Sequence, residues 1–225
     1  MQQIQAIQTI RAEPIVKRRI YINPLPVRIW HWVNALGFLL LVLTGAQIRY
    51  LDLFRLMSFE AAVKLHNWTG FVVIANYFLW LGFYLFSDKI TNYHPVLDAR
   101  RFMHNLLLQA RYYSYGIFRG EPSPHHVRPN DKFNALQRMT YQLVMLIAVP
   151  VQFATGLMLW DVNRFGAWVD AVGGIRVVAT VHVLLFAFFV FFILVHAYMG
   201  ALGQKPSTHF KEMITGFEEE EETED

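Results

Sequence analysis

The sequence contains no cysteine and few charged residues. Of its 225 residues, 16% are charged and 55% are hydrophobic. The absence of cysteine excludes disulfides, thiolate-bound iron–sulfur clusters and heme attachment through a C-x-x-C-H motif. A typical soluble domain carries about 25% charged residues, so the low charge indicates a membrane protein. Any bound metal must use other ligands, and the nine histidines are the first candidates.

The N-terminal segment lacks the apolar core of a cleavable signal peptide. In MQQIQAIQTIRAEPIVKRR, polar residues interrupt the apolar ones before the basic residues, so the segment is not expected to be a cleavable signal peptide. We therefore expect the first hydrophobic segment to remain in the membrane. Four segments reach the length of about 20 residues that a spanning helix needs. They lie near residues 29–48, 67–86, 136–160 and 175–202, and Pro150 is expected to kink the third. The sequence therefore predicts an all-α integral membrane four-helix bundle.

Positive charge is distributed unequally around these spans. Thirteen Lys and Arg residues lie in the N-terminal segment, the loop of residues 87–131 and the C-terminal tail, against five in the two other loops. The positive-inside rule then places both termini and the long loop in the cytoplasm. The expected location is the bacterial cytoplasmic (inner) membrane.

The regions outside the spans differ in their expected order. The middle of the 87–131 loop, VLDARRFMHNLLLQARYYSYGIF, has apolar residues at helical spacing beside arginines, which predicts an interfacial amphipathic helix. The acidic end FEEEEETED has no means of building a core, and we expect it to be disordered. The chain thus divides into a cytoplasmic segment 1–28, a transmembrane domain 29–203 and a cytoplasmic tail 204–225.

Four histidines, His31, His66, His182 and His196, lie within or at the ends of the spans. A polar side chain at membrane depth costs free energy, so each requires an explanation. A single histidine near a span end is often only a headgroup or hydrogen-bonding contact. However, their depths sort the four into two pairs, with His31 and His196 toward the cytoplasm and His66 and His182 toward the outside.

The two histidines of the last span are fourteen residues apart. This spacing corresponds to about 21 Å along a helix and a rotation of only about 40°, so both point to one side of the bundle. One helix can therefore supply a ligand to each of two stacked sites. Paired imidazoles from opposing helices are the axial ligands of low-spin heme iron, and they leave no open position for oxygen or substrate. We predict two hemes b, with iron ligands His31 and His196 in one and His66 and His182 in the other.

Small residues stand near these ligands at Gly45, Gly70 and Gly156. They could make room for a flat porphyrin, and close helix packing explains them equally well.

At these residues the sequence resembles the prokaryotic cytochrome b561 superfamily, and within it the b-type cytochrome subunits of nickel–iron hydrogenases, formate dehydrogenases and thiosulfate reductases. The resemblance extends over nearly the whole chain. It rests on PLPVRIWHWVNALGFLLLVLTG around His31, VKLHNWTG around His66, ATVHVLLFAFFVFFILVHAYMG around the last two histidines, and HFKEMITGF after them. The segment FNALQRMTYQL and the Arg-rich loop before it favour the thiosulfate-reductase-like branch.

The resemblance implies a cytoplasmic-side heme on His31 and His196, and a second heme on His66 and His182 that faces the periplasm and a partner subunit. It also implies a quinone site beside the cytoplasmic-side heme. The candidates for that site are His196 itself and the polar residues Asn134, Gln137 and Arg138. Helix-start and headgroup contacts explain the three polar residues equally well. Arg28, Lys64 and Arg176 are candidates for binding heme propionates or lipid headgroups.

The leading hypothesis is a membrane-anchor subunit of a respiratory oxidoreductase complex. It would transfer electrons between menaquinone or ubiquinone and an extracytoplasmic partner with iron–sulfur clusters or multiple c-type hemes, with no role for nucleic acid and no catalytic residue of its own beyond quinone redox. One alternative is a self-contained cytochrome b561-type quinone oxidoreductase. Another is a histidine-lined transporter of metal ions or protons, which predicts acidic residues beside the histidines and broken helices. The spans contain essentially no such acids.

Overall fold

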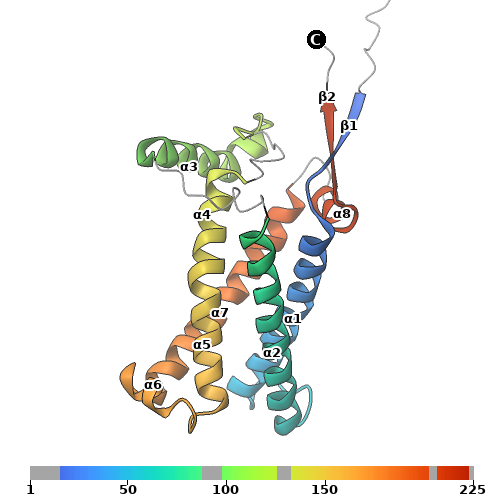
Figure 1. Cartoon of the computed structure of the whole chain (residues 1–225). Helices are drawn as coiled ribbons and strands as arrows, with labels where there is room; N and C mark the ends of the chain where they lie inside the picture. The colour runs from blue at the N-terminus through green and yellow to red at the C-terminus, as the bar shows by residue number, and fades with distance from the viewer. Residues whose placement is uncertain (1–15, 88–97, 126–132, 203–206, 223–225) are drawn as a thin grey trace, which may run out of the picture.

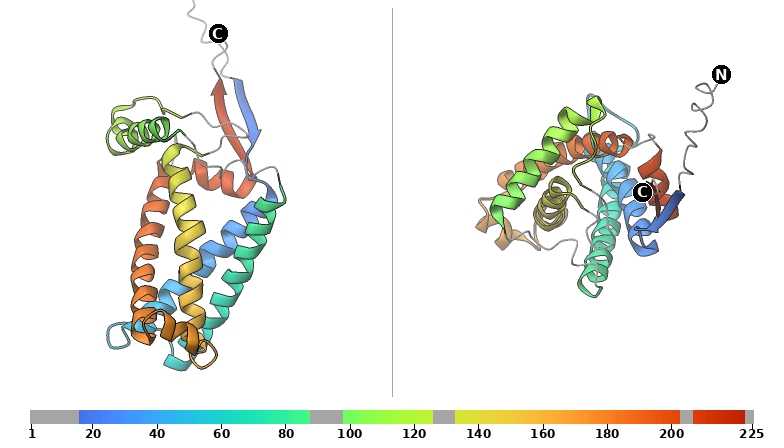
Figure 2. Two further views of the ribbon diagram at one scale, coloured as in Figure 1. Left: turned by 60° about the vertical axis from the view of Figure 1, so that its left-hand side comes forward. Right: turned by 90° about the horizontal axis from the view of Figure 1, so that it is seen from above.

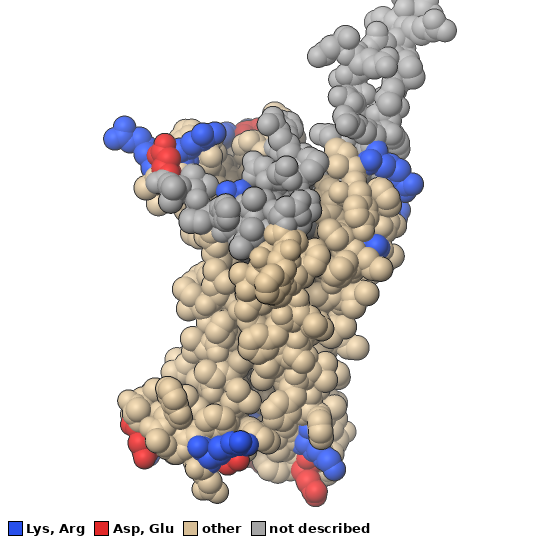
Figure 3. Space-filling model, viewed as in Figure 1, with Lys and Arg blue, Asp and Glu red and all other residues tan. Residues whose placement is uncertain are grey.

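Four long helices form the body of the molecule (Figure 1). The computed structural model describes residues 16–87, 98–125, 133–202 and 207–222. Each long helix has the length and apolar composition of a membrane span, which confirms the predicted fold class. The four are α1 (Leu25–Arg49), α2 (Phe59–Leu85), a segmented third helix (Ala135–Trp160) and α7 (Ile175–Ala201). On the face shown in Figure 3, the charged side chains gather at the two ends of the bundle. This distribution matches a bundle whose middle lies in hydrocarbon.

Helix α2 begins at Phe59 rather than near residue 67, where the sequence prediction placed its start. The Ser58 hydroxyl caps it by accepting a hydrogen bond from the Ala61 N–H at 3.2 Å. Hydropathy marks only the part of a helix that lies in lipid, whereas the cap sets the true first turn. His66 therefore lies inside a regular helix and not at its opening.

The third span is not a continuous α-helix. It consists of α4 (Ala135–Leu143), the π-helical turn η3 (Val144–Ala148) and α5 (Val149–Trp160). The N–H of Val149 bonds to the carbonyl of Val144, five residues back. Pro150 follows directly and has no N–H to donate. The kink predicted at Pro150 thus takes the form of a widened turn just before the proline.

The four spans pack as two pairs. Helix α1 runs along α2 and α5 runs along α7, while contacts between the pairs are sparse. A Cβ atom at Gly37 would lie 2.5 Å from Val73 Cγ2, so glycine allows α1 and α2 to approach. Asn76 adds polar links between the same two helices by donating to the Trp30 carbonyl at 3.0 Å and to Asn34 Oδ1 at 3.1 Å. Side chains of both pairs, among them Tyr77, Met145 and Phe189, nevertheless form one buried core.

Shorter helices cover the two ends of the bundle. Helix α3 (Ala99–Ser114) and the 3₁₀ turn η2 (Gly116–Arg119) lie across one end, as Figure 2 shows. The predicted helix in the second loop is thereby confirmed. Asp98 caps α3 by accepting from the Arg101 N–H at 2.9 Å. Helix α6 (Gly166–Ala171) lies at the opposite end, between α5 and α7 (Figure 1).

A two-stranded antiparallel ladder joins the N- and C-terminal regions. Strand β1 (Val16–Tyr21) pairs with β2 (Phe217–Glu222), and the register sets Lys17 opposite Glu221, Arg18 opposite Glu220 and Arg19 opposite Glu219. We expected the acidic end to be disordered; residues 217–222 form β2 here, and residues 223–225 lie outside the described residues.

Helix α8 (Thr208–Thr215) connects this ladder to the bundle. Arg28 and Trp32 of α1 donate hydrogen bonds to the last carbonyls of α8: Arg28 Nη1 to Ile214 and Trp32 Nε1 to Met213, the latter at 2.9 Å. Arg28, a candidate for propionate or headgroup binding, thus binds the α8 main chain. Gly216 ends α8 at φ +89°, and a Cβ there would lie 2.8 Å from the Asn23 carbonyl oxygen.

Candidate functional site

The structure brings the four intramembrane histidines together in the two pairs predicted from their depths. His66 of α2 faces His182 of α7, with ring centres 6.4 Å apart and ring planes at 69°. His31 of α1 faces His196 of α7, with ring centres 6.2 Å apart and ring planes at 46°. Each pair joins one helix of the α1–α2 pair to α7, across the sparse contact between the helix pairs.

Both separations suit a single iron between two imidazoles. An imidazole nitrogen binds a transition metal at about 2 Å and lies about 1 Å from its ring centre, so two rings on opposite sides of one metal have centres about 6 Å apart. If the rings of each pair only packed against each other, there would be no reason for both pairs to have this same separation. Within the described residues, no group of three or more His, Cys, Asp or Glu side chains is placed to hold a bare metal ion. The donor set therefore fits hemes with two axial histidines.

A threonine of the neighbouring helix holds His66. Thr44 Oγ1 of α1 lies 2.9 Å from His66 Nδ1 and donates its own proton to the Leu40 carbonyl at 2.6 Å. A hydroxyl has one proton, so when that proton goes to the Leu40 carbonyl the oxygen accepts from the imidazole and Nδ1 carries the hydrogen. The lone pair of His66 is then on Nε2, the tautomer that binds a metal through Nε2.

The same arrangement recurs at His182. Thr155 Oγ1 of α5 donates to the Val151 carbonyl at 2.9 Å and lies 3.0 Å from His182 Nδ1. His182 is thus also protonated on Nδ1. Its Nε2 lies 3.3 Å from the amide nitrogen of Gln152, so iron binding there requires that the glutamine side chain moves aside.

A glycine follows each of these threonines and lies against the histidine ring. A Cβ at Gly45 would stand 3.3 Å from His66 Cε1, and one at Gly156 would stand 3.2 Å from His182 Cε1. These glycines give room to the imidazoles. At Gly70 an added Cβ would meet nothing within 4 Å. The chain has four Thr-Gly dipeptides and only those at Thr44 and Thr155 make such contacts, so the dipeptide alone does not predict them.

Aromatic rings surround the other pair. His196 stacks on Phe192, one turn earlier in α7, with ring centres 5.7 Å apart, and His31 meets Trp32 edge to face at 5.2 Å. Trp32 also contacts Phe210 of α8 at 5.2 Å. This pair therefore lies at the end of the bundle that carries α8 and both terminal strands.

Comparison with known proteins identifies the family. Residues 23–216 match the family described as prokaryotic cytochrome b561. The chain belongs to the prokaryotic cytochrome b561 family. This confirms the resemblance noted at the histidine segments, and it makes the protein a membrane heme protein with b-type heme.

Two curated relatives cover most of this cytochrome b561. A protein of Escherichia coli (strain K12) named cytochrome YdhU is 32% identical over 201 residues, which are 88% of this chain and 74% of the relative. A protein of Azospira oryzae named as the YedZ1 subunit of a protein-methionine-sulfoxide reductase is 25% identical over 198 residues, which are 83% of this chain and 94% of the relative. No solved structure matched the chain.

Two of the three polar residues suggested for a quinone site, Asn134 and Gln137, have structural roles in this cytochrome b561. Asn134 and Gln137 form a reciprocal capping box at the start of α4, with hydrogen bonds of 2.9 and 3.1 Å. Asn134 also donates to the Tyr113 hydroxyl at 3.1 Å and so ties α4 to α3. Burial raises the pKa of Tyr113, which keeps this hydroxyl neutral. Arg138 follows in the first turn of α4. Quinone binding at these three residues stays a prediction.

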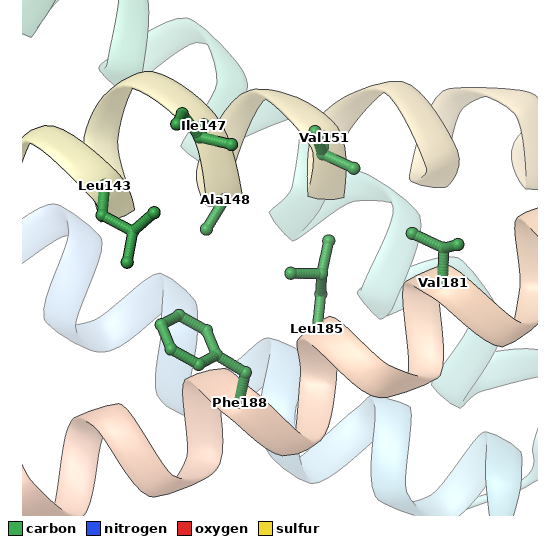
Figure 4. A pocket seen from close by; sticks show the side chains of 7 residues that line it. All are labelled: Leu143, Ile147, Ala148, Val151, Val181, Leu185 and Phe188. Atoms are coloured by element: carbon green, nitrogen blue, oxygen red, sulfur yellow. The ribbon is translucent and has the colours of Figure 1, made fainter.

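An apolar groove of about 310 Å³ lies between the third span and α7 (Figure 4). Seven side chains line it: Leu143, Ile147, Ala148, Val151, Val181, Leu185 and Phe188. None of the seven can donate a hydrogen bond to a quinone carbonyl. The groove suits a hydrocarbon chain and does not orient a quinone head group.

Proposed function

We propose that this cytochrome b561 holds two hemes b and transfers electrons between membrane quinone and an extracytoplasmic redox partner. The proposal rests on one observation: within each of two histidine pairs the rings face each other, with centres 6.2 and 6.4 Å apart. Bound heme b supplies one-electron exchange between ferric and ferrous iron. The chain brings two imidazoles together at each site, and if both bound the iron of one heme they would leave no position on it for oxygen or substrate.

The proposed orientation places the His31–His196 pair toward the cytoplasm. This pair lies at the end that carries both terminal strands, and the Lys and Arg excess of the terminal segments and the long loop supports a cytoplasmic location for that end. We place the site for menaquinone or ubiquinone beside this pair, with Arg138 as a candidate for contact. The His66–His182 pair then faces the partner.

A respiratory reductase complex is the proposed setting, with a partner that carries iron–sulfur clusters or multiple c-type hemes. The YedZ1 relative is named as a subunit of a reductase, which supports a subunit role. The FNALQRMTYQL segment and its preceding loop favour a thiosulfate-reductase-like complex. Mild-detergent purification from native membranes tests the partner: a chain that purifies alone and reduces quinone from a small reductant would favour the self-contained alternative.

Heme stoichiometry tests the site itself. We expect purified protein to show a b-type visible spectrum and two hemes per chain by pyridine hemochromogen assay. His182→Ala should leave one heme per chain. The matched control is His104→Ala, because His104 is exposed on α3 outside the spans and its loss should leave both hemes. A colourless preparation, or two hemes retained in His182→Ala, would refute the assignment.

A further inference from the structure

We infer that Thr44 and Thr155 are positioning residues that strengthen His66 and His182 as iron ligands and thereby lower the reduction potential of the heme at that site. The inference rests on the proposed function, because it requires that this pair binds heme iron. It goes beyond that function by assigning the control of one heme's potential to two residues that do not touch iron.

The first step is the direction of the hydrogen bonds. Both threonines are buried, with only 3% and 7% of their surfaces exposed. Each directs its single proton toward two carbonyls of its own helix, those of Leu40 and Leu41 for Thr44 and those of Val151 and Gln152 for Thr155. The oxygen therefore presents only lone pairs to the imidazole. Donation to a carbonyl also polarises the hydroxyl and makes it a better acceptor.

The second step is the effect on the ligand. An Nδ1–H bonded to an acceptor fixes the tautomer and the orientation of the ring, and it raises the basicity of Nε2. A more basic ligand stabilises ferric iron relative to ferrous iron, so the potential falls. Hydrogen bonds to axial ligands are among the means by which a protein sets heme potential.

The third step is that the same arrangement of a threonine and a glycine occurs twice, on two separate helices. Thr44 and Gly45 of α1 hold His66 of α2, and Thr155 and Gly156 of α5 hold His182 in the same way. In each case the threonine binds the ring nitrogen and the glycine lies against Cε1. Each ring is thus held between a hydroxyl and a backbone on the helix packed beside its own.

His196 at the other site has a different environment. Among the described residues its ring has aromatic contacts, including the stacked Phe192, and no hydrogen bond. The Thr-Gly arrangement therefore distinguishes the His66–His182 site from the environment of His196. We expect its removal to change only the heme bound by His66 and His182.

The test compares Thr44→Val and Thr155→Val with Thr44→Ser and Thr155→Ser. Valine keeps the shape of threonine and removes the hydroxyl, whereas serine keeps the hydroxyl. Redox titration of the two hemes should show one potential raised in each valine variant, with about a tenfold change in the reduced-to-oxidised ratio, which is about 59 mV for one electron. The other heme should keep its potential, and the serine variants should match the unaltered protein. The heme missing from His182→Ala identifies which potential belongs to which site.

The outcomes separate this inference from the proposed function. Two hemes with unchanged potentials in the valine variants would overturn the inference and leave the function standing, as would serine variants that shift as far as valine. Loss of one heme from the valine variants alone, with its retention in the serine variants, would support the inference. Should the valine variants not fold, Thr44→Ala and Thr155→Ala take their place. An unaltered protein without heme would overturn the function itself.

Discussion

The hydroxyl group of Tyr77 on α2 donates a hydrogen bond to the main-chain carbonyl of Met145, at 2.9 Å. This carbonyl lies in the π-helical turn and has lost both of its usual partners. In an α-helix the Val149 N–H would bond to it, but that group bonds to Val144. In a continued π-helix Pro150 would donate, but proline has no N–H. Tyr77 therefore satisfies a carbonyl that the kink releases, and it joins the two helix pairs.

Tyr77→Phe is expected to destabilise the protein by about 1–3 kcal/mol, because it leaves a buried carbonyl without a donor. Thermal unfolding in detergent, followed by circular dichroism, measures the change. The matched control is Tyr198→Phe, since Tyr198 lies exposed on α7. Equal melting temperatures for the two variants would show that the Met145 carbonyl finds another partner.

Gly216→Ala is expected to loosen α8 from α1. The residue has φ +89°, which costs a side-chain-bearing residue about 1–2 kcal/mol, and the added Cβ would lie 2.7 Å from Tyr21 Cε2. Hydrogen exchange should therefore accelerate in residues 208–215 and in the paired strands. Gly200→Ala is the control, because a Cβ there meets nothing within 4 Å. Unchanged exchange in α8 would contradict the importance of this turn.

The sequence was sufficient to predict the four spans, the helix in the second loop and the pairing of the histidines. These features depend on local hydropathy and on depth along a helix, which a single sequence records. The fourteen-residue spacing of His182 and His196 placed both on one side of α7 before any helix packing was known.

Features that depend on packing between distant segments were missed. The contact of Thr155 with His182 joins residues 27 positions apart on two helices, and no periodicity reports it. The pairing of the acidic end with residues 16–21 joins the two ends of the chain. The start of α2 was missed because Glu60 and Lys64 lower the hydropathy of its first turns, although Ser58 is a recognisable cap.

Gly156→Ala is expected to weaken heme retention at the His66–His182 site. The Cβ would stand 3.2 Å from His182 Cε1, so the ring must shift by a few tenths of an ångström against its hydrogen bond to Thr155. Disturbing the groups that orient a metal ligand typically costs about 10–100-fold in affinity. Heme titration of the apoprotein measures this loss. Gly82→Ala, whose Cβ meets nothing within 4 Å, should bind heme as the unaltered protein does. Equal heme affinities of Gly156→Ala and the unaltered protein would mean that the His182 ring can shift without weakening heme binding.

The orientation of the bundle can be tested with single cysteines, because the chain has none of its own. Leu53 is 87% exposed in the loop between α1 and α2, at the end proposed to face outward. His104 is exposed on α3 at the opposite end. We expect Leu53→Cys to react with a membrane-impermeant maleimide in spheroplasts and His104→Cys to react only after lysis. Phe78→Cys, within a span, should react in neither case. The reverse pattern would place the His66–His182 pair toward the cytoplasm. The partner would then have to reach the His31–His196 pair past α8, which shields that end of the bundle through its contacts with Arg28 and Trp32.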